Sequence, residues 1–288
     1  MNSQTNAKNK LYIGLDIHKR SWKFHFATDF TIGSSKSFPA WISTIVNYVN
    51  KHYPYYKVGI PEEGGCCGYV PARAFIEQGW DTYVENPVDI PRPAKNKFTK
   101  TDKIDAKNVA LQLRSGNLKK VTIPDLAREG LRSLTRQRTA LIRDFRRIKS
   151  RIKSFLLYLH IDIDPKCETP KWPKAFIHWL ENLSFETQTN RRTRDSMLAQ
   201  YSFIDAQIKQ VSIDIRAYCR NHHKNDYSLL RSIPGIGPLT AAYVLAELGD
   251  LRRFTSIKRL ASYVGFVPGI YQCGNTEIST GTNPRAKR

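Results

Sequence analysis

The chain has 288 residues, of which 41% are hydrophobic, and its 46 basic and 25 acidic residues give a formal net charge of +21. This length allows two or three domains with a substantial core, and the hydrophobic content excludes a disordered chain. The basic excess predicts a polyanionic partner. The sequence has no run of 18 apolar residues, which argues against a transmembrane helix and a membrane partner.

The cysteines and the first residues predict the compartment. The five cysteines are an odd number without CxxC spacing, so they predict reduced thiols rather than a disulfide framework. Paired Cys/His spacing typical of structural zinc is also absent. The first ten residues lack an apolar signal core. Together these features predict a cytoplasmic protein.

The first part of the chain alternates between strand and helix patterns. The apolar run at 11–17 predicts a buried strand, and the alternation at 22–26 predicts a second strand that pairs with it as an antiparallel hairpin. A hairpin followed by alternating helices and strands predicts a mixed α/β domain over residues 1–125. The further elements expected there are a helix at 40–52, a strand at 55–60, a helix at 69–79, a short strand at 82–84, a proline-rich loop and a helix at 102–115.

Four acidic positions in this domain are hard to explain as ordinary surface. Asp16 interrupts the first apolar strand, and the pair Glu62 and Glu63 follows a strand-like stretch. Asp102 and Asp105 are three apart, which puts both on one face at the start of a helix. Each acid alone would be interpreted as a helix cap or a surface residue. Because Mg²⁺ prefers carboxylate ligands, the combination predicts a magnesium site acting on a phosphodiester.

From residue 126 the pattern changes to two long helices with apolar positions at heptad spacing. They flank an insert at 160–190 and predict either an antiparallel helical hairpin or a dimerising coiled coil over 126–224. Residues 126–160 carry ten lysines and arginines against two acids, which predicts a nucleic-acid backbone site, with a solvated helix face as the alternative. The candidates for backbone binding are Arg143, Arg146, Arg147 and Lys149.

A third segment begins near residue 225 and contains a Pro-Gly-Ile-Gly turn at 234–237 between two helical patterns. This turn is typical of a helix-hairpin-helix module, in which glycines let backbone N–H groups approach a DNA phosphate. The candidate phosphate-binding residues are therefore Gly235 and Gly237. The alternative is a tight turn between helices that binds no ligand.

Five motifs occur in an order that resembles one protein family. They are GLDIHK at 14–19, EGG at 63–65, KTDKIDA at 100–106, IPGIGP at 233–238 and LASYVGFVP at 260–268. Together they resemble the DEDD transposases of the insertion-sequence-110 family, from about residue 11 to the end of the chain. Each motif alone is weakly specific, whereas the ordered set is highly specific.

The resemblance implies an RNase H-like (RuvC-like) N-terminal domain that binds Mg²⁺, a coiled-coil middle region, and a C-terminal transposase domain over 225–288 with a nucleophilic serine. It implies a site-specific recombinase of a mobile element that assembles on DNA as a homo-oligomer, a dimer or tetramer, with an element-encoded guide RNA. A bacterial, nucleoid-associated location follows from this. The catalytic and metal-binding residues at the matching positions are Asp16, Glu63, Asp102 and Asp105.

The sequence departs from the family pattern at two places. Cys273 occupies the position of the nucleophilic serine, and the chain stops at Arg288, before the final helices of the family. We therefore expect a degenerate or truncated copy with doubtful strand-transfer activity. Glu63 is preferred to Glu62 because the glycines and arginine that follow then match the family. Two further hypotheses are a RuvC-like metal-dependent nuclease or resolvase that needs no Cys273, and a non-enzymatic nucleic-acid-binding protein.

Overall fold

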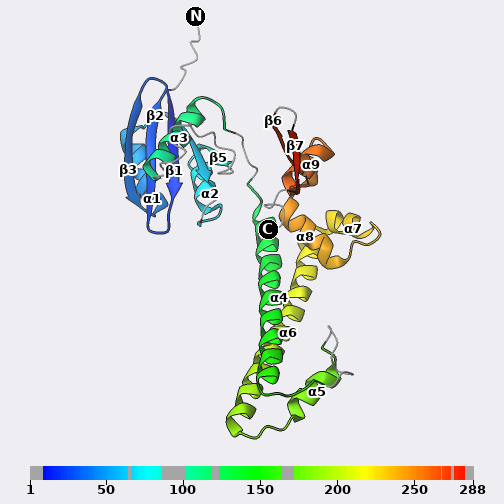
Figure 1. The fold of residues 1–288 in the computed structure, drawn as a ribbon. Helices are drawn as coiled ribbons and strands as arrows, with labels where there is room; N and C mark the ends of the chain where they lie inside the picture. The colour runs from blue at the N-terminus through cyan, green and yellow to red at the C-terminus, as the bar shows by residue number, and fades with distance from the viewer. Residues whose placement is uncertain are drawn as a thin grey trace, which may run out of the picture. The chain divides into compact units, whose positions relative to one another are not determined.

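The computed structural model describes residues 9–63, 66–85, 102–118, 123–163, 172–266, 268–273 and 276–282. The chain divides into two compact units, a first unit of residues 1–123 and a second unit of residues 124–288 (Figure 1). The predicted division of the later part into separate domains at 126–224 and 225–288 stays a prediction. No helix in the described part of the chain is both long and apolar enough to cross a membrane.

A five-stranded mixed sheet forms the centre of the first unit. Strand β1 pairs with β2 in antiparallel orientation and with β4 in parallel orientation, and the full order is β3-β2-β1-β4-β5. This mixed α/β architecture is compatible with the RNase H-like domain that the sequence predicted. The strands are β1 (Lys10–Ile17), β2 (Ser21–Thr28), β3 (Ile32–Pro39), β4 (Lys57–Glu63) and β5 (Asp81–Glu85).

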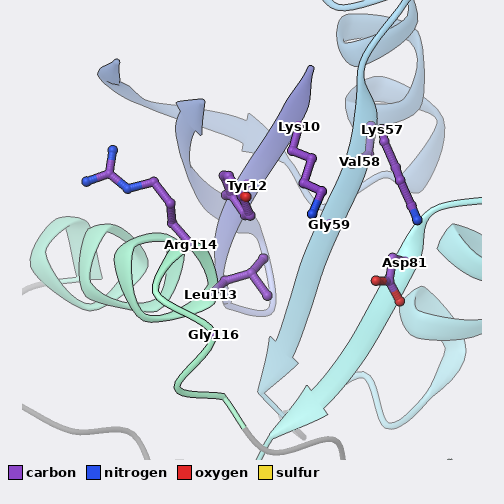
Figure 2. Close-up of a pocket in the computed structure, with 9 residues that line it drawn as sticks. All are labelled: Lys10, Tyr12, Lys57, Val58, Gly59, Asp81, Leu113, Arg114 and Gly116. Atoms are coloured by element: carbon purple, nitrogen blue, oxygen red, sulfur yellow. The ribbon is translucent and has the colours of Figure 1, made fainter. Parts of the chain in front are cut away.

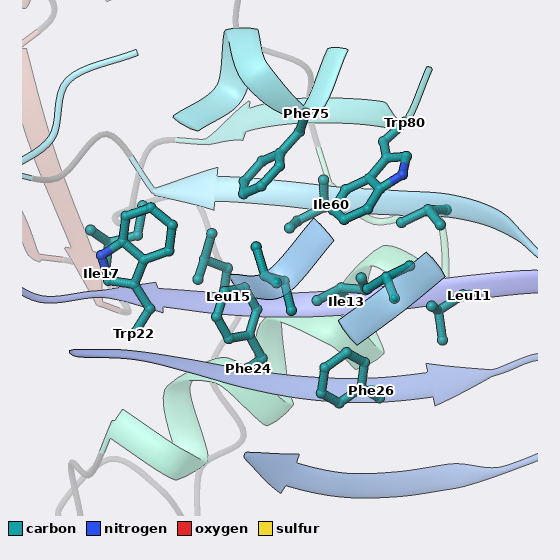
Figure 3. Close-up of a cluster of buried hydrophobic side chains, with 13 residues drawn as sticks. Leu11, Ile13, Leu15, Ile17, Trp22, Phe24, Phe26, Ile60, Phe75 and Trp80 are labelled. Atoms are coloured by element: carbon teal, nitrogen blue, oxygen red, sulfur yellow. The ribbon is translucent and has the colours of Figure 1, made fainter. Parts of the chain in front are cut away.

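Helices cover both faces of this sheet. Alternate residues of β1, including Leu11, Ile13 and Leu15, are buried in a core that also contains Ile45 of α1 and Phe75 of α2 (Figure 3). The other face of β1 packs against α3. The period-2 alternation of the first two strands therefore reflects two buried faces with different partners. The helices are α1 (Ile42–His52), α2 (Val70–Glu77) and α3 (Asp102–Arg114).

Two long helices, α4 (Leu126–Tyr158) and α6 (Gln188–His222), pack side by side and antiparallel within the chain (Figure 1). One buried cluster joins Ile148, Ile152 and Leu156 of α4 to Leu198 of α6 and to Phe176 of α5 (Lys174–Asn182). Intrachain pairing therefore covers the apolar seam, as the hairpin alternative predicted.

Side chains in the middle of the helix pair are less buried than those toward its ends. Along α4, all of whose residues are described, none between 136 and 147 is buried. The Arg138 Nε group donates a 2.8 Å hydrogen bond to the Ser212 hydroxyl, which in turn donates to the Ile208 carbonyl. The two fully buried clusters thus lie toward opposite ends of the pair, with half-buried seam residues such as Leu141 and Ile208 between them.

Short helices follow α6 in the second unit. Helices α7 (Lys224–Arg231) and α8 (Pro238–Leu248) pack together around Tyr227 and Leu245, and this cluster also takes in Leu131 of α4. The remaining elements are the 3₁₀ turn η2 (Leu251–Arg253), helix α9 (Ile257–Val264) and an antiparallel hairpin of β6 (Pro268–Cys273) and β7 (Thr276–Thr282).

Three features differ from the sequence-based expectations. Strand β3 was not predicted, because it is an edge strand whose residues are mostly exposed and carry little apolar alternation. Helix α5 lies within the segment that was interpreted only as an insert. Strand β4 runs on through Glu62 and Glu63 to its end, so these glutamates belong to the strand rather than following it.

Candidate active site

Asp16 lies near the carboxyl end of β1 on the face that packs against α3. Its side chain is 14% exposed, and the His18 Nε2 atom lies 3.4 Å from its Oδ2 atom. Lys23 of β2 is its direct partner across the antiparallel pair, so both side chains are on the same face. The Asp16 carboxylate therefore has one basic side chain beside it from its own strand segment and another from the neighbouring strand. The roles of His18 and Lys23 beside Asp16 were missed by the sequence reasoning, although His18 lies in the motif at 14–19.

Gly14 lets α3 approach β1 directly. A Cβ atom at this position would collide with the carbonyl oxygen of Ala106 and would lie 2.6 Å from the backbone nitrogen of Ala110. Ala106 and Ala110 are both fully buried. Any side chain larger than hydrogen at residue 14 would push the helix away from the strand. The sequence GLD thus places a contact point for α3 two residues before Asp16.

The direction of α3 determines which of its ends lies near Asp16. Leu113, near the end of α3, packs over Gly59, and the Arg114 guanidinium donates to the carbonyl oxygen of Thr28 at 3.4 Å. These partners lie toward the starting ends of β1 and β4. Helix α3 therefore runs antiparallel to β1, and its first residues point toward the carboxyl ends of β1 and β4.

Element lengths agree with this arrangement. Asp16 is two residues beyond Gly14, about 7 Å along the strand at about 3.3 Å per residue. Asp102 is four residues before Ala106, about 6 Å along the helix axis at about 1.5 Å per residue. Asp105 directly precedes Ala106 and is half-buried. The backbone positions of Asp16, Asp102 and Asp105 thus belong to the same end of the first unit.

The side chains of Glu63 and Asp102 lie outside the described side chains, so the convergence of four carboxylates stays a prediction. Among the described residues, no group of three or more His, Cys, Asp or Glu side chains is arranged to hold a metal ion. The backbone register is clear for β4: it pairs with β1 from Lys10–Lys57 to Tyr12–Gly59 and with β5 as far as Glu63–Glu85.

The candidate nucleic-acid residues of α4 differ in exposure. Arg143, Arg146 and Arg147, which we call the arginine patch, are exposed, and Arg147 also binds Asp144 at 3.0 Å. Lys149 is half-buried, and burial lowers the pKa of its ammonium group. Its Nζ atom lies 4.6, 5.3 and 5.9 Å from the ring centroids of Phe145, Trp172 and Tyr201. Lys149 thus has aromatic partners within the chain, while the arginine patch faces solvent.

The Pro-Gly-Ile-Gly turn connects α7 to α8 as the sequence pattern predicted. Gly235 has a φ of +86°, a left-handed conformation that favours glycine, and Gly237 is the N-terminal cap of α8. No described atom lies within 4 Å of a Cβ built on either glycine, so the backbone of the turn is open to a ligand. Cys273 is the last residue of β6 and pairs with Thr276, and its side chain lies outside the described side chains.

Two family models match the chain over ranges that include both candidate regions. A DEDD transposase model of IS110 type matches residues 13–161, and a model described as transposase IS116/IS110/IS902 family matches residues 227–288. The chain belongs to the IS110 family of transposases. Membership in this DEDD family implies divalent-metal chemistry at acidic residues. The sequence-based family assignment is therefore confirmed.

Individual transposases and recombinases resemble this chain over different parts of its length. The chain is 28% identical over 219 residues to the y4qE protein of Sinorhizobium fredii, covering 76% of this chain and 52% of that one. It is 26% identical over 250 residues to the transposase for insertion sequence element IS1533 of Leptospira borgpetersenii, covering 85% and 71%. It is 36% identical over 94 residues, 29% of each chain, to the pilin gene-inverting protein of Moraxella bovis. The chain thus spans about half the length of the first of these relatives.

Proposed function

We propose that this IS110-family chain is the transposase, or site-specific recombinase, of a mobile insertion element and transfers DNA strands at a site containing Asp16. The observation that carries the proposal is the direct contact of α3 with Gly14, two residues before Asp16 in a half-buried position. This contact orients the start of α3 toward the end of β1. The names of the relatives support the same activity.

The alternation of side chains between the two faces of β4 supports Glu63, rather than Glu62, as the glutamate that joins the three aspartates. Neighbouring positions of a strand alternate between faces. Position 63 has the parity of Gly59, which packs against Leu113 of α3, whereas position 62 has the parity of Val58 and Ile60, which are buried in the core. The ladder between β4 and β5 has no register shift up to position 63. We therefore assign Glu63 to the face that Asp16 occupies.

The donor chemistry of these positions fits a divalent metal such as Mg²⁺. Oxygen ligands from carboxylates suit this ion, and the acids come from strands β1 and β4 and from helix α3, whose backbone packs directly on β1 at Gly14. Asp16, Glu63, Asp102 and Asp105 would hold the metal, which when bound would neutralise charge on phosphodiester oxygens. The basic side chains of His18 and Lys23 border the proposed Asp16 ligand, His18 with its Nε2 atom 3.4 Å from the carboxylate.

The second unit would supply the nucleic-acid contacts. The arginine patch is exposed on α4, and the turn at Gly235 and Gly237 presents open backbone to a phosphate. We propose that these regions bind DNA and an element-encoded guide RNA, and that the functional form is a homo-oligomer. A cytoplasmic, nucleoid-associated location belongs to the same proposal.

The side chain of residue 273 determines whether a covalent bond to DNA can form after the DNA has bound. At the serine position of the family, a side-chain oxygen would attack the DNA phosphate, form an O–P bond and release the departing strand's oxygen. Cys273 would attack with sulfur, a softer atom than oxygen and therefore a poorer match for the phosphorus of a phosphodiester. Mg²⁺ likewise prefers oxygen ligands to sulfur. We therefore propose that DNA binding persists in this chain and that strand transfer is weak.

A strand-transfer assay tests this proposal. Cognate DNA, Mg²⁺ and any associated RNA would be combined with the chain as given, Cys273→Ser, Asp16→Asn and the matched control Glu77→Gln, an exposed acid of the same unit. We expect Asp16→Asn to abolish residual cleavage and Glu77→Gln to retain it. Cleavage by Asp16→Asn at the control rate would refute the acidic site. Robust covalent DNA attachment at Cys273 would refute the degenerate-copy interpretation, and cleavage retained by Cys273→Ala without attachment would favour a metal-dependent nuclease.

A further inference from the structure

A basic pocket opens at the end of the first unit opposite to Asp16. It encloses about 250 Å³ between the starts of β1 and β4 and the end of α3. Figure 2 shows that three cationic residues from three different elements line it, namely Lys10, Lys57 and Arg114. Val58, Gly59 and Leu113 also line it. The space equals roughly eight water molecules at about 30 Å³ each, enough for a hydrated anionic group.

The charge balance of the pocket favours an anion. Asp81 is the acidic residue among those that line it, against the three cations, and Figure 2 shows the Lys57 side chain extending toward Asp81. The nearby Asp29 is engaged with the strand, because it accepts hydrogen bonds from the Tyr12 hydroxyl at 2.8 Å and the Lys10 backbone N–H at 3.2 Å. Counting both Asp81 and Asp29 against the three cations leaves one positive charge in excess, so the pocket is net positive.

Two exposed aromatic residues lie in turns at the same end of the sheet as this pocket. Phe30 is 84% exposed and directly follows Asp29, which binds Lys10. Tyr55 is 83% exposed and lies two residues before Lys57, the register partner of Lys10. One exposed aromatic residue would need no explanation. Two rings beside three cations form the combination by which proteins hold single-stranded nucleic acid, with bases on the rings and phosphates on the cations.

We propose that this end of the first unit binds single-stranded nucleic acid, with a backbone phosphate in the pocket and unpaired bases stacked on Phe30 and Tyr55. A single strand is favoured over a duplex because paired bases do not offer their faces to protein rings. The site is distinct from the acidic end, since Tyr12 and Asp16 are four residues apart, about 13 Å along β1. The proposal goes beyond strand transfer and stands without it, since binding here needs neither the metal nor Cys273.

The test is fluorescence anisotropy of the full chain with labelled 12-nucleotide single strands, in EDTA. The double variant Lys10→Gln/Lys57→Gln is compared with Lys107→Gln/Lys174→Gln, which removes the same charge at exposed lysines elsewhere. Loss of the phosphate contact in the pocket should weaken binding about fivefold at 0.1 M salt and lower the salt slope by about 0.7, while the control pair keeps the wild-type slope. Phe30→Ala and Tyr55→Ala should each weaken binding about fivefold or more.

Further measurements distinguish DNA from RNA as the ligand and single-strand binding from general binding to a basic surface. DNA and RNA strands of the same sequence tell which nucleic acid binds better, and a duplex of that sequence should lose less than about twofold with the ring variants. Ultraviolet crosslinking of bromouracil-containing strands should map to the peptides of Phe30 or Tyr55. Equal losses by both lysine pairs, or equal losses of duplex and single strand in the ring variants, would overturn the proposal. Asp16→Asn should bind single strands normally, so failure of the acidic site would leave this result intact.

Discussion

Replacing Gly14 by alanine tests whether α3 is held against β1 by the absence of a side chain. The added Cβ would meet the Ala106 carbonyl oxygen and the Ala110 nitrogen, both of them backbone atoms that cannot rotate away. Overpacking a buried contact costs about 1–3 kcal/mol, and a collision with backbone belongs at the upper end of that range. We expect Gly14→Ala to lower the unfolding midpoint of the first unit by about 10 °C, at roughly 3–4 °C per kcal/mol for its size.

Gly59→Ala is the matched control for this variant. It lies on the same face of the neighbouring strand, but its Cβ would meet the Leu113 Cδ2 atom at 3.4 Å and the backbone oxygens of Leu11 and Asp81 at 3.9 Å, all of them ordinary van der Waals contacts. We expect a change below about 1 kcal/mol for this control. Differential scanning calorimetry of the full chain would measure both variants against wild type.

The same pair of variants reports on the acidic end. If the start of α3 contributes metal ligands, Mg²⁺ should raise the unfolding midpoint of wild type and of Gly59→Ala by binding the folded state. Displacement of α3 in Gly14→Ala should remove most of that rise. An unchanged midpoint in Gly14→Ala would refute the close packing, whereas a Mg²⁺-induced rise equal to that of wild type would refute the link between α3 position and metal binding.

Three further predictions concern the second unit. Replacing the arginine patch by glutamine should flatten the salt dependence of DNA binding. Lys149→Gln should leave that salt dependence unchanged and lower the free energy of unfolding by about 1 kcal/mol, because the Lys149 ammonium lies over three aromatic rings. Burial, and next the Arg128 guanidinium, lower the pKa of His223, so the unfolded state binds its proton first and stability should fall as pH drops below about 6.5; His223→Gln should remove this part of the pH dependence. Burial raises the pKa of Cys219 to about 11, so iodoacetamide at pH 8 should label exposed Cys66 and spare Cys219 until the chain unfolds.

Each of these three has a result that contradicts it. A steep salt slope in the triple arginine variant would assign DNA binding to another surface. A pH profile of unfolding that is identical in wild type and His223→Gln would remove His223 as its cause. Labelling of the two cysteines would be measured by mass spectrometry of their peptides. Equal labelling of Cys66 and Cys219 would show that the buried side of α6 opens readily in the native state.

The sequence predicted the first two strands and the two long helices because their apolar spacing is strong. Strand β1 alternates between a core face and an α3 face, and α4 and α6 carry a heptad seam that the structure buries within one chain. It did not predict β3, whose exposure leaves no apolar pattern, and its apolar seam alone could not decide between intrachain and interchain pairing.

The candidate site was predicted in part. Position in a strand or at a helix start singled out Asp16, Asp102 and Asp105, and strand parity now adds a reason for Glu63. The pocket with Lys10, Lys57 and Arg114 carries no sequence signal, because its residues come from three separate elements and meet only through sheet register. The partners of Lys149 were likewise not predictable, since Trp172 and Tyr201 reach it from other segments.

The lower burial at mid-length of the α4–α6 pair has a mechanical consequence. Fully buried side chains gather around Leu131 and around Ile152, whereas at mid-length seam residues such as Leu141 and Ile208 are only half-buried and the helices share the hydrogen bond from Arg138 to Ser212. Half-buried contacts and hydrogen bonds near water rearrange more readily than a close-packed core. We therefore expect the pair to bend more easily at mid-length than at either end.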